Sequence, residues 1–358
     1  MGKEEDIKKI EDEILKTKYN KHTQYHIGQL KAKIARLKEE SESSGKSGAG
    51  GKVFSVRKSG DATVLLVGFP SVGKSTLLNR ITSADSKVGD YDFTTLDVIP
   101  GVMEYNSARI QILDIPGIVS GASSGRGRGK EILSVIRNAD LVLVMIENLV
   151  QLQVIRRELY GAGFRLNEKP PNVVIRKTDR GGVMVSAGVR LRHIDEKMVR
   201  LVVNERGIHN ADVVIREDLT LDRLIDATSG NRAYVKVAIV WSKSDLLTDE
   251  QRKTMPKDFI KISPLKGEGI EELKKAIWSR LEFIRVYLKR IGKPADMEKP
   301  LIMKRSATVY EAAEKIHREF ARNLESARIW GPSARFEGQK VGIKHILRDR
   351  DVVELHMK

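Results

Sequence analysis

The sequence predicts an α/β protein whose central domain is a doubly wound, mostly parallel sheet, and three features support this prediction. Apolar runs at 64–67, 141–146 and 235–240 have the length and composition of strands buried on both faces. Segments with helical spacing alternate with these runs, as they do when helices cover both sides of a parallel sheet. A glycine-rich loop joins the first run to a helical segment, which is where such sheets place a ligand site.

The glycine-rich loop fits the phosphate-binding pattern G-x-x-x-x-G-K-[ST]. Its glycines let the backbone approach a phosphate closely, and its N–H groups lie at the positive end of a helix dipole. Lys74 is expected to reach the β- and γ-phosphates of a nucleoside triphosphate and to assist catalysis, while the Ser75 hydroxyl ligates Mg²⁺. An ordinary glycine-rich turn is the alternative. The residues predicted to contact nucleotide here are Gly68, Phe69, Pro70, Ser71, Val72, Gly73, Lys74, Ser75 and Thr76.

The composition indicates a basic protein of two or three domains. The 358 residues carry a formal net charge of +16. This excess of Lys and Arg favours a partner with many phosphates, RNA above all, and a solvated charged surface is the alternative. Cysteine is absent, which suits a cytoplasmic protein and excludes thiolate sites. No apolar run can span a bilayer and the N-terminus shows no signal sequence, so we expect no membrane partner.

The chain is expected to consist of three parts. Residues 1–50 predict a helical segment, broken at 17–23, and a Ser/Gly-rich linker. The α/β domain spans 51–290, with an insertion at about 166–234 that interrupts the alternation of strands and helices. Residues 291–358 predict a helix packed on a small mixed sheet. Further predicted elements are strands at 102–105, 109–113, 173–176, 183–186, 259–262 and 301–303, and helices at 131–138, 149–160, 269–288 and 309–320.

A second phosphate-sensing motif, Asp114-Ile115-Pro116-Gly117, follows the strand at 109–113. About 40 residues after a phosphate loop, D-x-x-G predicts an aspartate that holds Mg²⁺ through water and a glycine N–H on the γ-phosphate. Between the two motifs lie Thr94 and Thr95, and we prefer Thr95 as the switch residue that closes on Mg²⁺ and the γ-phosphate. Gly117 and Thr95 therefore join Lys74 as candidate catalytic residues.

With these motifs in place, the chain resembles the developmentally regulated GTP-binding protein (DRG) branch of the Obg-type GTPases. The resemblance is carried by GFPSVGKSTLLN, DYDFTTLDVIPG, LDIPGIVSGASSGRGRGK, KPPNVVIRKTDRGG, IHNADVVIRED, RIWGPS and VGIKHILRDRDVVEL. It implies an N-terminal helical segment, a P-loop GTPase domain with a small α/β insertion, and a C-terminal TGS domain of β-grasp type. It also implies binding of GTP and GDP and an association with ribosomes or ribosomal RNA.

The base-reading motifs depart from the family pattern. Ser242-Lys243-Ser244-Asp245 stands where N-K-x-D is usual, and Ser263-Pro264-Leu265 stands for S-A-x. Asp245 can still accept hydrogen bonds from guanine N1 and N2, whereas Ser242 is too short to replace asparagine. Pro264 has no N–H for guanine O6. We therefore predict a preference for GTP over ATP that depends mainly on Asp245, and an ATPase with relaxed base specificity is the alternative.

The position after Gly117 bears on the rate of hydrolysis. Ile118 stands where Ras-like enzymes carry a water-positioning glutamine, and an isoleucine cannot orient water. Hydrolysis is then expected to be slow and to be accelerated by a partner, either the ribosome or a regulatory protein. Activation by K⁺ is left open, because the phosphate-loop position that carries asparagine in K⁺-activated GTPases is Ser71 here.

The remaining polar features give weaker predictions. The loop at 121–130 carries Arg126, Arg128 and Lys130 among glycines, which suits either a mobile switch or a solvated loop. His22 and His26 lack a third ligand in sequence, so structural roles are favoured over metal binding. A scaffold that binds RNA, with nucleotide only regulating its docking, is the second hypothesis for the whole chain.

Overall fold

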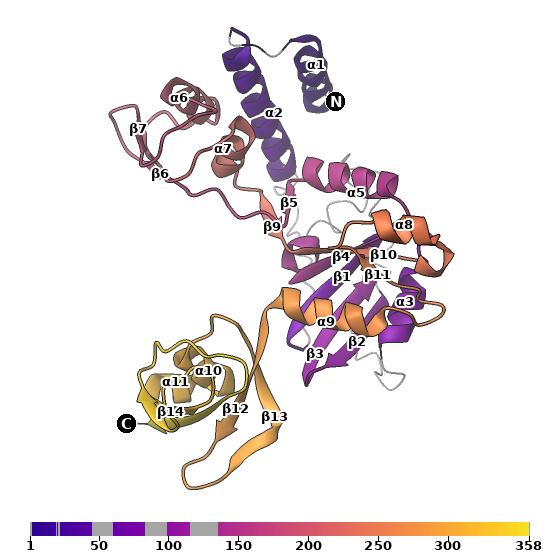
Figure 1. Cartoon of the computed structure of the whole chain (residues 1–358). Helices are drawn as coiled ribbons and strands as arrows, with labels where there is room; N and C mark the ends of the chain where they lie inside the picture. The colour runs from indigo at the N-terminus through magenta and orange to yellow at the C-terminus, as the bar shows by residue number, and fades with distance from the viewer. Residues whose placement is uncertain are drawn as a thin grey trace. The chain divides into compact units, whose positions relative to one another are not determined.

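The computed structural model in Figure 1 places most of the chain in two compact units. It describes residues 2–18, 20, 22–44, 60–82, 99–114 and 135–357. The first unit comprises Met1–Val53 and Gly163–Tyr234, and the second comprises Phe54–Ala162 and Val235–Lys358. Within the described residues, no helix is both long enough and apolar enough to cross a membrane.

The second unit is built around a six-stranded sheet with strand order β11-β10-β4-β1-β3-β2. All neighbouring strands are parallel except β2 and β3, which confirms the mostly parallel sheet. Strand β1 lies near the middle and every one of its residues is buried, so its apolar run needs no polar alternation. The strands are β1 (Ala62–Gly68), β2 (Ile99–Tyr105), β3 (Ala108–Asp114), β4 (Leu141–Ile146), β10 (Val237–Trp241) and β11 (Ile260–Lys261).

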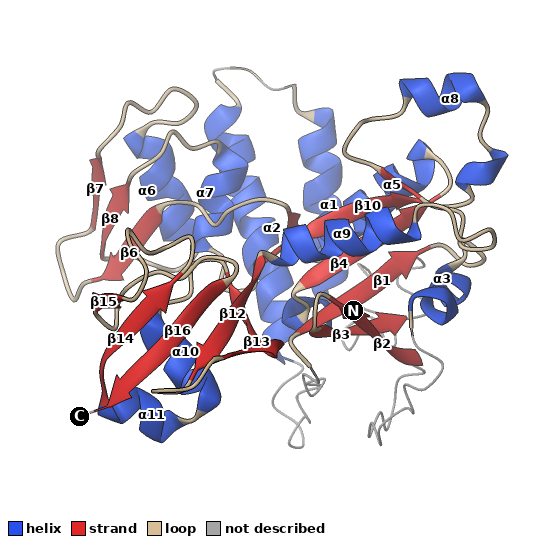
Figure 2. Cartoon of the chain, turned by 60° about the horizontal axis from the view of Figure 1, so that its bottom comes forward, coloured by secondary structure: helices blue, strands red, loops and turns tan. Residues whose placement is uncertain are grey.

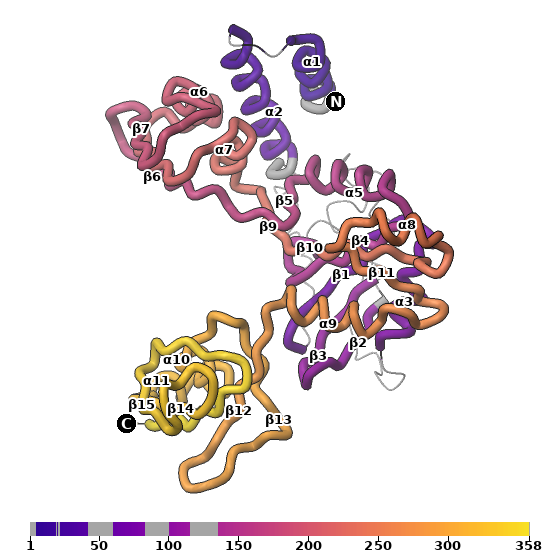
Figure 3. The backbone as a smooth tube through the Cα atoms, in the orientation of Figure 1, coloured from indigo at the N-terminus to yellow at the C-terminus, as the bar shows by residue number. Residues whose placement is uncertain are grey.

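Helices cover both faces of this sheet, as a doubly wound fold requires. Helices α3 (Lys74–Ile81) and α9 (Ile270–Leu281) share one apolar core with alternate residues of β1, such as Val64 and Leu66. Helix α5 (Leu149–Gly161) lies on the opposite side of the sheet from α9 (Figures 1, 2 and 3). A short 3₁₀ turn (Ser244–Leu246) and helix α8 (Asp249–Thr254) follow β10.

The helix predicted over 269–288 is wrong over its last seven residues, 282–288. Helix α9 ends at Leu281, because Glu282 takes a left-handed conformation with φ of 54°. The next seven residues, FIRVYLK, alternate and are rich in β-branched and aromatic types, which favours a strand. They form β12 (Phe283–Lys289), the first strand of the C-terminal sheet.

The C-terminal sheet has strand order β13-β12-β16-β14-β15 and packs against two helices. Strands β12 and β16 are parallel and the other neighbours are antiparallel, so the predicted mixed sheet is present. The helix predicted over 309–320 is interrupted at His317, whose extended backbone separates two short helices. The elements are β13 (Ala295–Lys304), α10 (Val309–Ile316), α11 (Arg318–Asn323), β14 (Leu324–Trp330), β15 (Gln339–Val341) and β16 (Asp351–Met357).

The first unit joins the N-terminal helices to the insertion through one apolar core. Ala32 and Ala35 of helix α2 lie in the same cluster as Met198 and Val202 of helix α6. Gly28 permits this close approach, because a Cβ atom there would stand 2.5 Å from the Met198 sulfur. The elements are α1 (Gly2–Lys16), α2 (Gln24–Ser44), β6 (Val173–Lys177), β7 (Val183–Ala187), α6 (Glu196–Glu205), β8 (Ala211–Ile215) and α7 (Leu221–Thr228), with the pair β5 (Phe164–Leu166) and β9 (Ala233–Val235) at its base.

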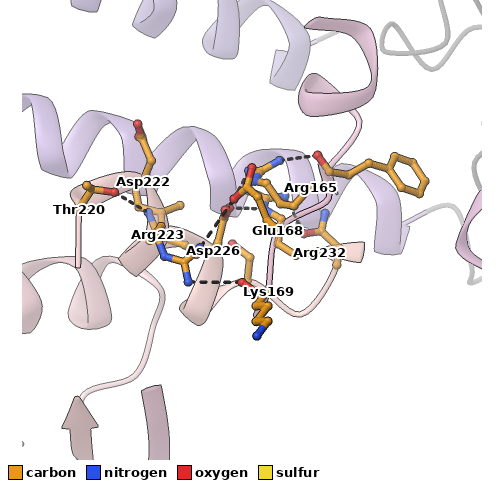
Figure 4. A network of polar contacts seen from close by, with 12 residues as sticks. Arg165, Glu168, Lys169, Thr220, Asp222, Arg223, Asp226 and Arg232 are labelled. Carbon is orange, nitrogen blue, oxygen red and sulfur yellow. Dashed lines mark hydrogen bonds and ion pairs between the residues drawn. The ribbon is translucent and has the colours of Figure 1, made fainter. Parts of the chain in front are cut away.

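A buried ion network fixes the base of the insertion (Figure 4). The Asp226 carboxylate of α7 accepts two hydrogen bonds from the Arg165 guanidinium, at 2.5 and 2.6 Å, and one from Arg232 at 2.7 Å. The Arg165 and Asp226 side chains are only 4% and 5% exposed. Beside them, Arg223 reaches the Glu217 carboxylate and the Lys169 carbonyl. Removal of Asp226 would leave two cations without their shared anion, which is the costly way to break a buried pair.

Candidate nucleotide site

The glycine-rich loop connects the buried end of β1 to the first turn of α3. Strand β1 has β4 on one side and β3 on the other, and the connections to these two neighbours lead in opposite directions across the sheet. The loop therefore lies at a topological switch point, where open α/β sheets bind their ligands. Gly73 has φ of 94°, a left-handed value that suits glycine, and it precedes the first helical residue. A Cβ atom on Gly68 would stand 2.7 Å from the Met145 carbonyl oxygen. Both positions therefore require glycine for the loop to keep this path.

Lys74 lies across the loop rather than in solvent. Its ammonium donates to the carbonyl oxygens of Gly68 and Phe69, at 3.2 and 3.0 Å. Burial lowers the pKa of Lys74 below its ordinary value, and the negative charge of Asp114 acts in the opposite direction. Among the described residues its hydrogen-bond partners are carbonyl oxygens, and such a partly desolvated cation gains strongly from an anion placed beside it.

Ser75 and Asp114 form a pair of oxygen ligands next to that ammonium. Asp114 ends β3 and pairs in register with Leu66 of β1, which brings its carboxylate to the start of α3. The Ser75 hydroxyl donates to Asp114 Oδ2 at 3.0 Å. Asp114 is buried, and its other carboxylate oxygen has no hydrogen-bond partner among the described residues. An unsatisfied carboxylate oxygen beside a hydroxyl is the donor set that Mg²⁺ prefers, so these residues fit the expected ion.

The end of β10 brings Ser242 to the glycine-rich loop. The Ser242 N–H donates to the Ile146 carbonyl at 2.8 Å, and its side chain is fully enclosed. Its hydroxyl oxygen lies 3.3 Å from where a Cβ atom on Gly73 would be, yet it has no hydrogen-bond partner among the residues that the structure describes. Lys243 takes a left-handed conformation, and its ammonium forms an ion pair with Glu147 at 2.7 Å.

Asp245 is held in place by the loop that follows β11. A hydrogen bond with the Ser263 side chain lowers the pKa of Asp245, and the Lys266 ammonium, 3.6 Å from its Oδ2, adds to this effect. Ser263 is fully buried, and its hydroxyl also accepts from the Lys266 N–H at 3.3 Å. Asp245 therefore stays a carboxylate, with acceptor oxygens for the two donors of a guanine base.

The following residues of this loop, Pro264 and Leu265, lie next to the phosphate loop and α3. The Pro264 ring lies 3.7 Å from the Cβ position of Gly73, and Arg80 of α3 donates to the Leu265 carbonyl at 3.2 Å. Ser244 is buried and its N–H donates to the Ile262 carbonyl, which ties the Asp245 turn to the residue that follows β11. The structure thus brings both predicted base-reading segments to one glycine.

Several predicted residues fall outside the described part of the chain. These are Thr94, Thr95, Ile115, Pro116, Gly117, Ile118 and the arginine-rich loop at 121–130. Within the described loop, Val72 is buried against Gly68, Ser71 has φ of 61°, and Phe69, Pro70 and Thr76 are at least partly exposed.

Sequence reasoning missed three supporting residues: Glu147, Arg80 and Lys266. Glu147 directly follows the apolar run of β4, at the same edge of the sheet as the phosphate loop, and that position was the available signal. Arg80 and Lys266 act through a backbone carbonyl and a neighbouring carboxylate, and no sequence pattern marks such contacts. His26 pairs with Glu13 at 2.8 Å, and no metal-binding group of three side chains occurs among the described residues.

The fold and the arrangement around Gly73 define a P-loop nucleotide-binding protein of the GTPase class. Residues 63–177 match the family model described as a 50S ribosome-binding GTPase, 180–283 match the C-terminal region of that domain, and 284–357 match the TGS domain.

Relatives in other organisms extend this match to the whole chain. An uncharacterized GTP-binding protein of Methanocaldococcus jannaschii is 51% identical, and the match covers all of this chain and 94% of that one. A developmentally regulated GTP-binding protein 2 homolog of Dictyostelium discoideum is 42% identical over the full length of both chains. Developmentally regulated G-protein 3 of Arabidopsis thaliana is 40% identical, with 98% of each chain covered. The chain belongs to the family of developmentally regulated GTP-binding proteins, which confirms the resemblance found in the sequence.

Proposed function

We propose that this protein is a Mg²⁺-dependent GTP-hydrolysing switch that acts on ribosomes in the cytoplasm. The observation that supports it best is the group formed by Lys74, Ser75 and Asp114. A partly desolvated ammonium, a hydroxyl and an unsatisfied carboxylate oxygen lie together at the start of α3. This set suits the β- and γ-phosphates of a nucleoside triphosphate with its metal ion.

Each of these groups has a distinct task in the proposed reaction. Backbone N–H groups of the loop hold the phosphates, and the Lys74 ammonium exchanges its two carbonyl partners for β- and γ-phosphate oxygens. Ser75, Asp114 (through water) and Thr95 would hold Mg²⁺, which supplies charge neutralisation at the β- and γ-phosphates when it is bound. Thr95 and Gly117 would report the γ-phosphate to the surrounding segments and release them after hydrolysis.

The proposed intrinsic rate is slow, because Ile118 offers no group that positions water. Catalysis then depends on preorganised charge around the transferred phosphoryl group. A ribosome or a regulatory protein would supply what Ile118 does not. K⁺ is a second source of positive charge, and the cation dependence of the rate separates the two.

The proposed base preference is for guanine and depends on Asp245. Its carboxylate accepts from both N1–H and the N2 amino group of guanine, whereas adenine offers no such pair of donors. Pro264 contributes no N–H, so the oxygen O6 is not read at that position. The ribosome as partner is supported by the description of the matched family model and by the net charge of +16.

Hydrolysis measured with GTP or ATP, in Na⁺ or K⁺, with and without ribosomes, tests the whole proposal. We expect slow GTP hydrolysis by the protein alone, acceleration by ribosomes, and little ATP hydrolysis. Equal rates with ATP would instead favour an ATPase with relaxed specificity. Ribosome binding without any acceleration in single-turnover reactions would favour the scaffold hypothesis.

A further inference from the structure

The three-stranded sheet of the insertion has one covered face and one exposed face. Its strand order is β6-β8-β7, and the register pairs Val174 with Val214 and Arg176 with Asp212. Side chains of the opposite set, such as Val213 and Ile215, are buried in the core that includes α6 and α7. Figure 2 shows these helices on one side of the sheet. We call the other side the open face, whose members Val174, Arg176, Met184, Ser186, Asp212 and Val214 follow from strand alternation.

Positive charge gathers on the open face and at its two ends. Arg176 lies on β6, and Arg180 lies in the turn that follows it. Parallel strands β7 and β8 end at the same edge with the pair Ala187 and Ile215, and Arg190 and Arg216 follow these two strand ends in the sequence. The exposed cations on or next to the open face are Arg176, Arg180, Arg190, Arg192 and Arg216, and none of them forms an ion pair with another described residue.

The carboxylates of the insertion are, in contrast, mostly engaged elsewhere. Glu217 pairs with Arg223, Asp222 with Lys31, and Asp226 with Arg165 and Arg232. Asp218 accepts from the Arg192 N–H and lies 3.8 Å from His193. On the open face itself the one acidic side chain is Asp212, and Asp179 lies beside Arg180 in the adjoining turn. Arg176 and Asp212 balance each other on the open face itself, so the positive excess comes from Arg180, Arg190, Arg192 and Arg216 at its ends.

The residue types on this face indicate how a polyanion would be read. Between Phe164 and Tyr234 the sequence contains no phenylalanine, tyrosine or tryptophan. A sheet that binds single-stranded RNA stacks bases on aromatic side chains, and this sheet has none to offer. Arginines without aromatics suit phosphates arranged regularly on a double helix, which is recognised by shape and backbone.

We propose that the open face of the insertion binds double-stranded RNA through its phosphate backbone. This inference rests on the proposed action on ribosomes and names the surface and the form of RNA for it. Arg176, Arg190 and Arg216 contact phosphates, and Asp212 opposes binding by its like charge.

Fluorescence anisotropy with the full-length protein in GDP tests this surface. The probe is a labelled RNA duplex of about 20 base pairs, longer than the ~16 base pairs that a double-stranded-RNA module spans. The variant R176Q/R190Q/R216Q is expected to bind at least about tenfold more weakly, and the slope of log affinity against log salt falls by about two to three. D212N is expected to bind more tightly, by about twofold to threefold, because it removes a like charge without adding a contact.

A charge-matched control separates a local surface from net charge. R109Q/R200Q/K274Q removes the same three charges, but from side chains that pair with Glu104, Glu196 and Glu271. We expect it to bind the duplex within about twofold of the wild type. Binding and hydrolysis of GTP are measured for every variant and stay unchanged, so failure of the nucleotide site would be seen separately.

Three outcomes would overturn the proposal. Wild-type duplex affinity in R176Q/R190Q/R216Q would exclude the open face. An equal loss in the charge-matched control would show that net charge alone attracts RNA. A single strand of the same sequence that binds more tightly than the duplex would assign another class of ligand to this surface. Anionic lipid vesicles that bind while the duplex does not would do the same.

Discussion

The phosphate end of the site (Gly68–Ser75 with Asp114) and the base end (Ser242–Asp245 with Ser263–Leu265) meet at Gly73 but differ in construction. At the phosphate end, two glycines are dictated by backbone geometry and three polar side chains contact one another or the loop. At the base end, Ser242 and Pro264 occupy the positions nearest the loop and offer it no hydrogen bond, whereas Asp245 is braced by Ser263 and Lys266.

This difference shows which part of a nucleotide site tolerates substitution. Phosphate binding uses the path of the main chain, so a change of residue there changes the path itself. Base recognition uses individual side chains, each with its own hydrogen bonds, and a neighbour such as Ser263 can support the Asp245 carboxylate. We therefore expect changes at the phosphate end to abolish binding and changes at the base end to alter selectivity.

Substitution of Lys74 by alanine should have the largest effect. It removes the charged donor to two phosphates, which is worth about 3 kcal/mol, or roughly a hundredfold in GTP affinity. Isothermal titration calorimetry with GTP and GDP measures this loss, and thermal unfolding verifies the fold. K243A is the counterpart at the base end and should lose less than about tenfold. Equal losses in the two variants would remove the contrast between the two ends.

Substitution of Asp245 by asparagine should change the base preference rather than phosphate binding. An amide presents one acceptor and one donor, which matches the N1–H and the C2 carbonyl of xanthine but not the two donors of guanine. GTP affinity should fall by about tenfold to a hundredfold, and xanthosine triphosphate should bind more tightly than GTP. Competition titrations with GTP, ATP and xanthosine triphosphate measure this exchange. Unchanged GTP selectivity would show that the base is read elsewhere.

The pH dependence of GTP affinity should come from the phosphate end at alkaline pH. Burial lowers the pKa of Lys74 in the free protein, and bound phosphate raises that pKa. At a pH where the lysine of the free protein is partly deprotonated, GTP binding is therefore accompanied by uptake of a proton. GTP affinity should therefore fall as pH rises, by up to about tenfold per pH unit above the pKa of the free protein, and begin to fall below pH 10.5, the ordinary lysine value. In K74A the part of this slope that the lysine contributes should be absent. A slope of the same size in both proteins would assign the titration to another group.

The two ends also differ in what their sequence could predict. Lys74, Ser75 and Asp114 were predicted as a group because the pattern and its spacing reflect one backbone geometry, and the structure brings them together. The support of Asp245 by Ser263 was not predicted, since it joins residues from the segments that follow β10 and β11, and only the folded sheet sets the relative position of those strands.

The types of the secondary-structure elements show the same contrast between what local sequence predicts and what only the folded chain sets. The parallel strands were readable as apolar runs, whereas the strand Phe283–Lys289 was mistaken for the end of a helix. Its residues continue the apolar content of α9, and the deciding event is the left-handed turn at Glu282, which its sequence does not announce. The core that joins α2 to α6 was likewise missed, because Gly28 and Met198 lie far apart in the chain.

The smallest predicted effect compares two buried serines at the base end. S263A removes the hydroxyl that bonds to Asp245 and accepts from the Lys266 N–H, so the Asp245 pKa should rise towards its ordinary value and the carboxylate should lose its fixed position. The loss of one net hydrogen bond predicts a roughly fivefold loss in GTP affinity with ATP affinity unchanged. S242A is the matched control, because the Ser242 hydroxyl has no hydrogen-bond partner among the described residues and its removal should change GTP affinity by less than about twofold. If S242A instead weakened GTP binding as much as S263A, the short side chain would be taking over the task of asparagine, and the base end would depend on two residues rather than on Asp245 alone.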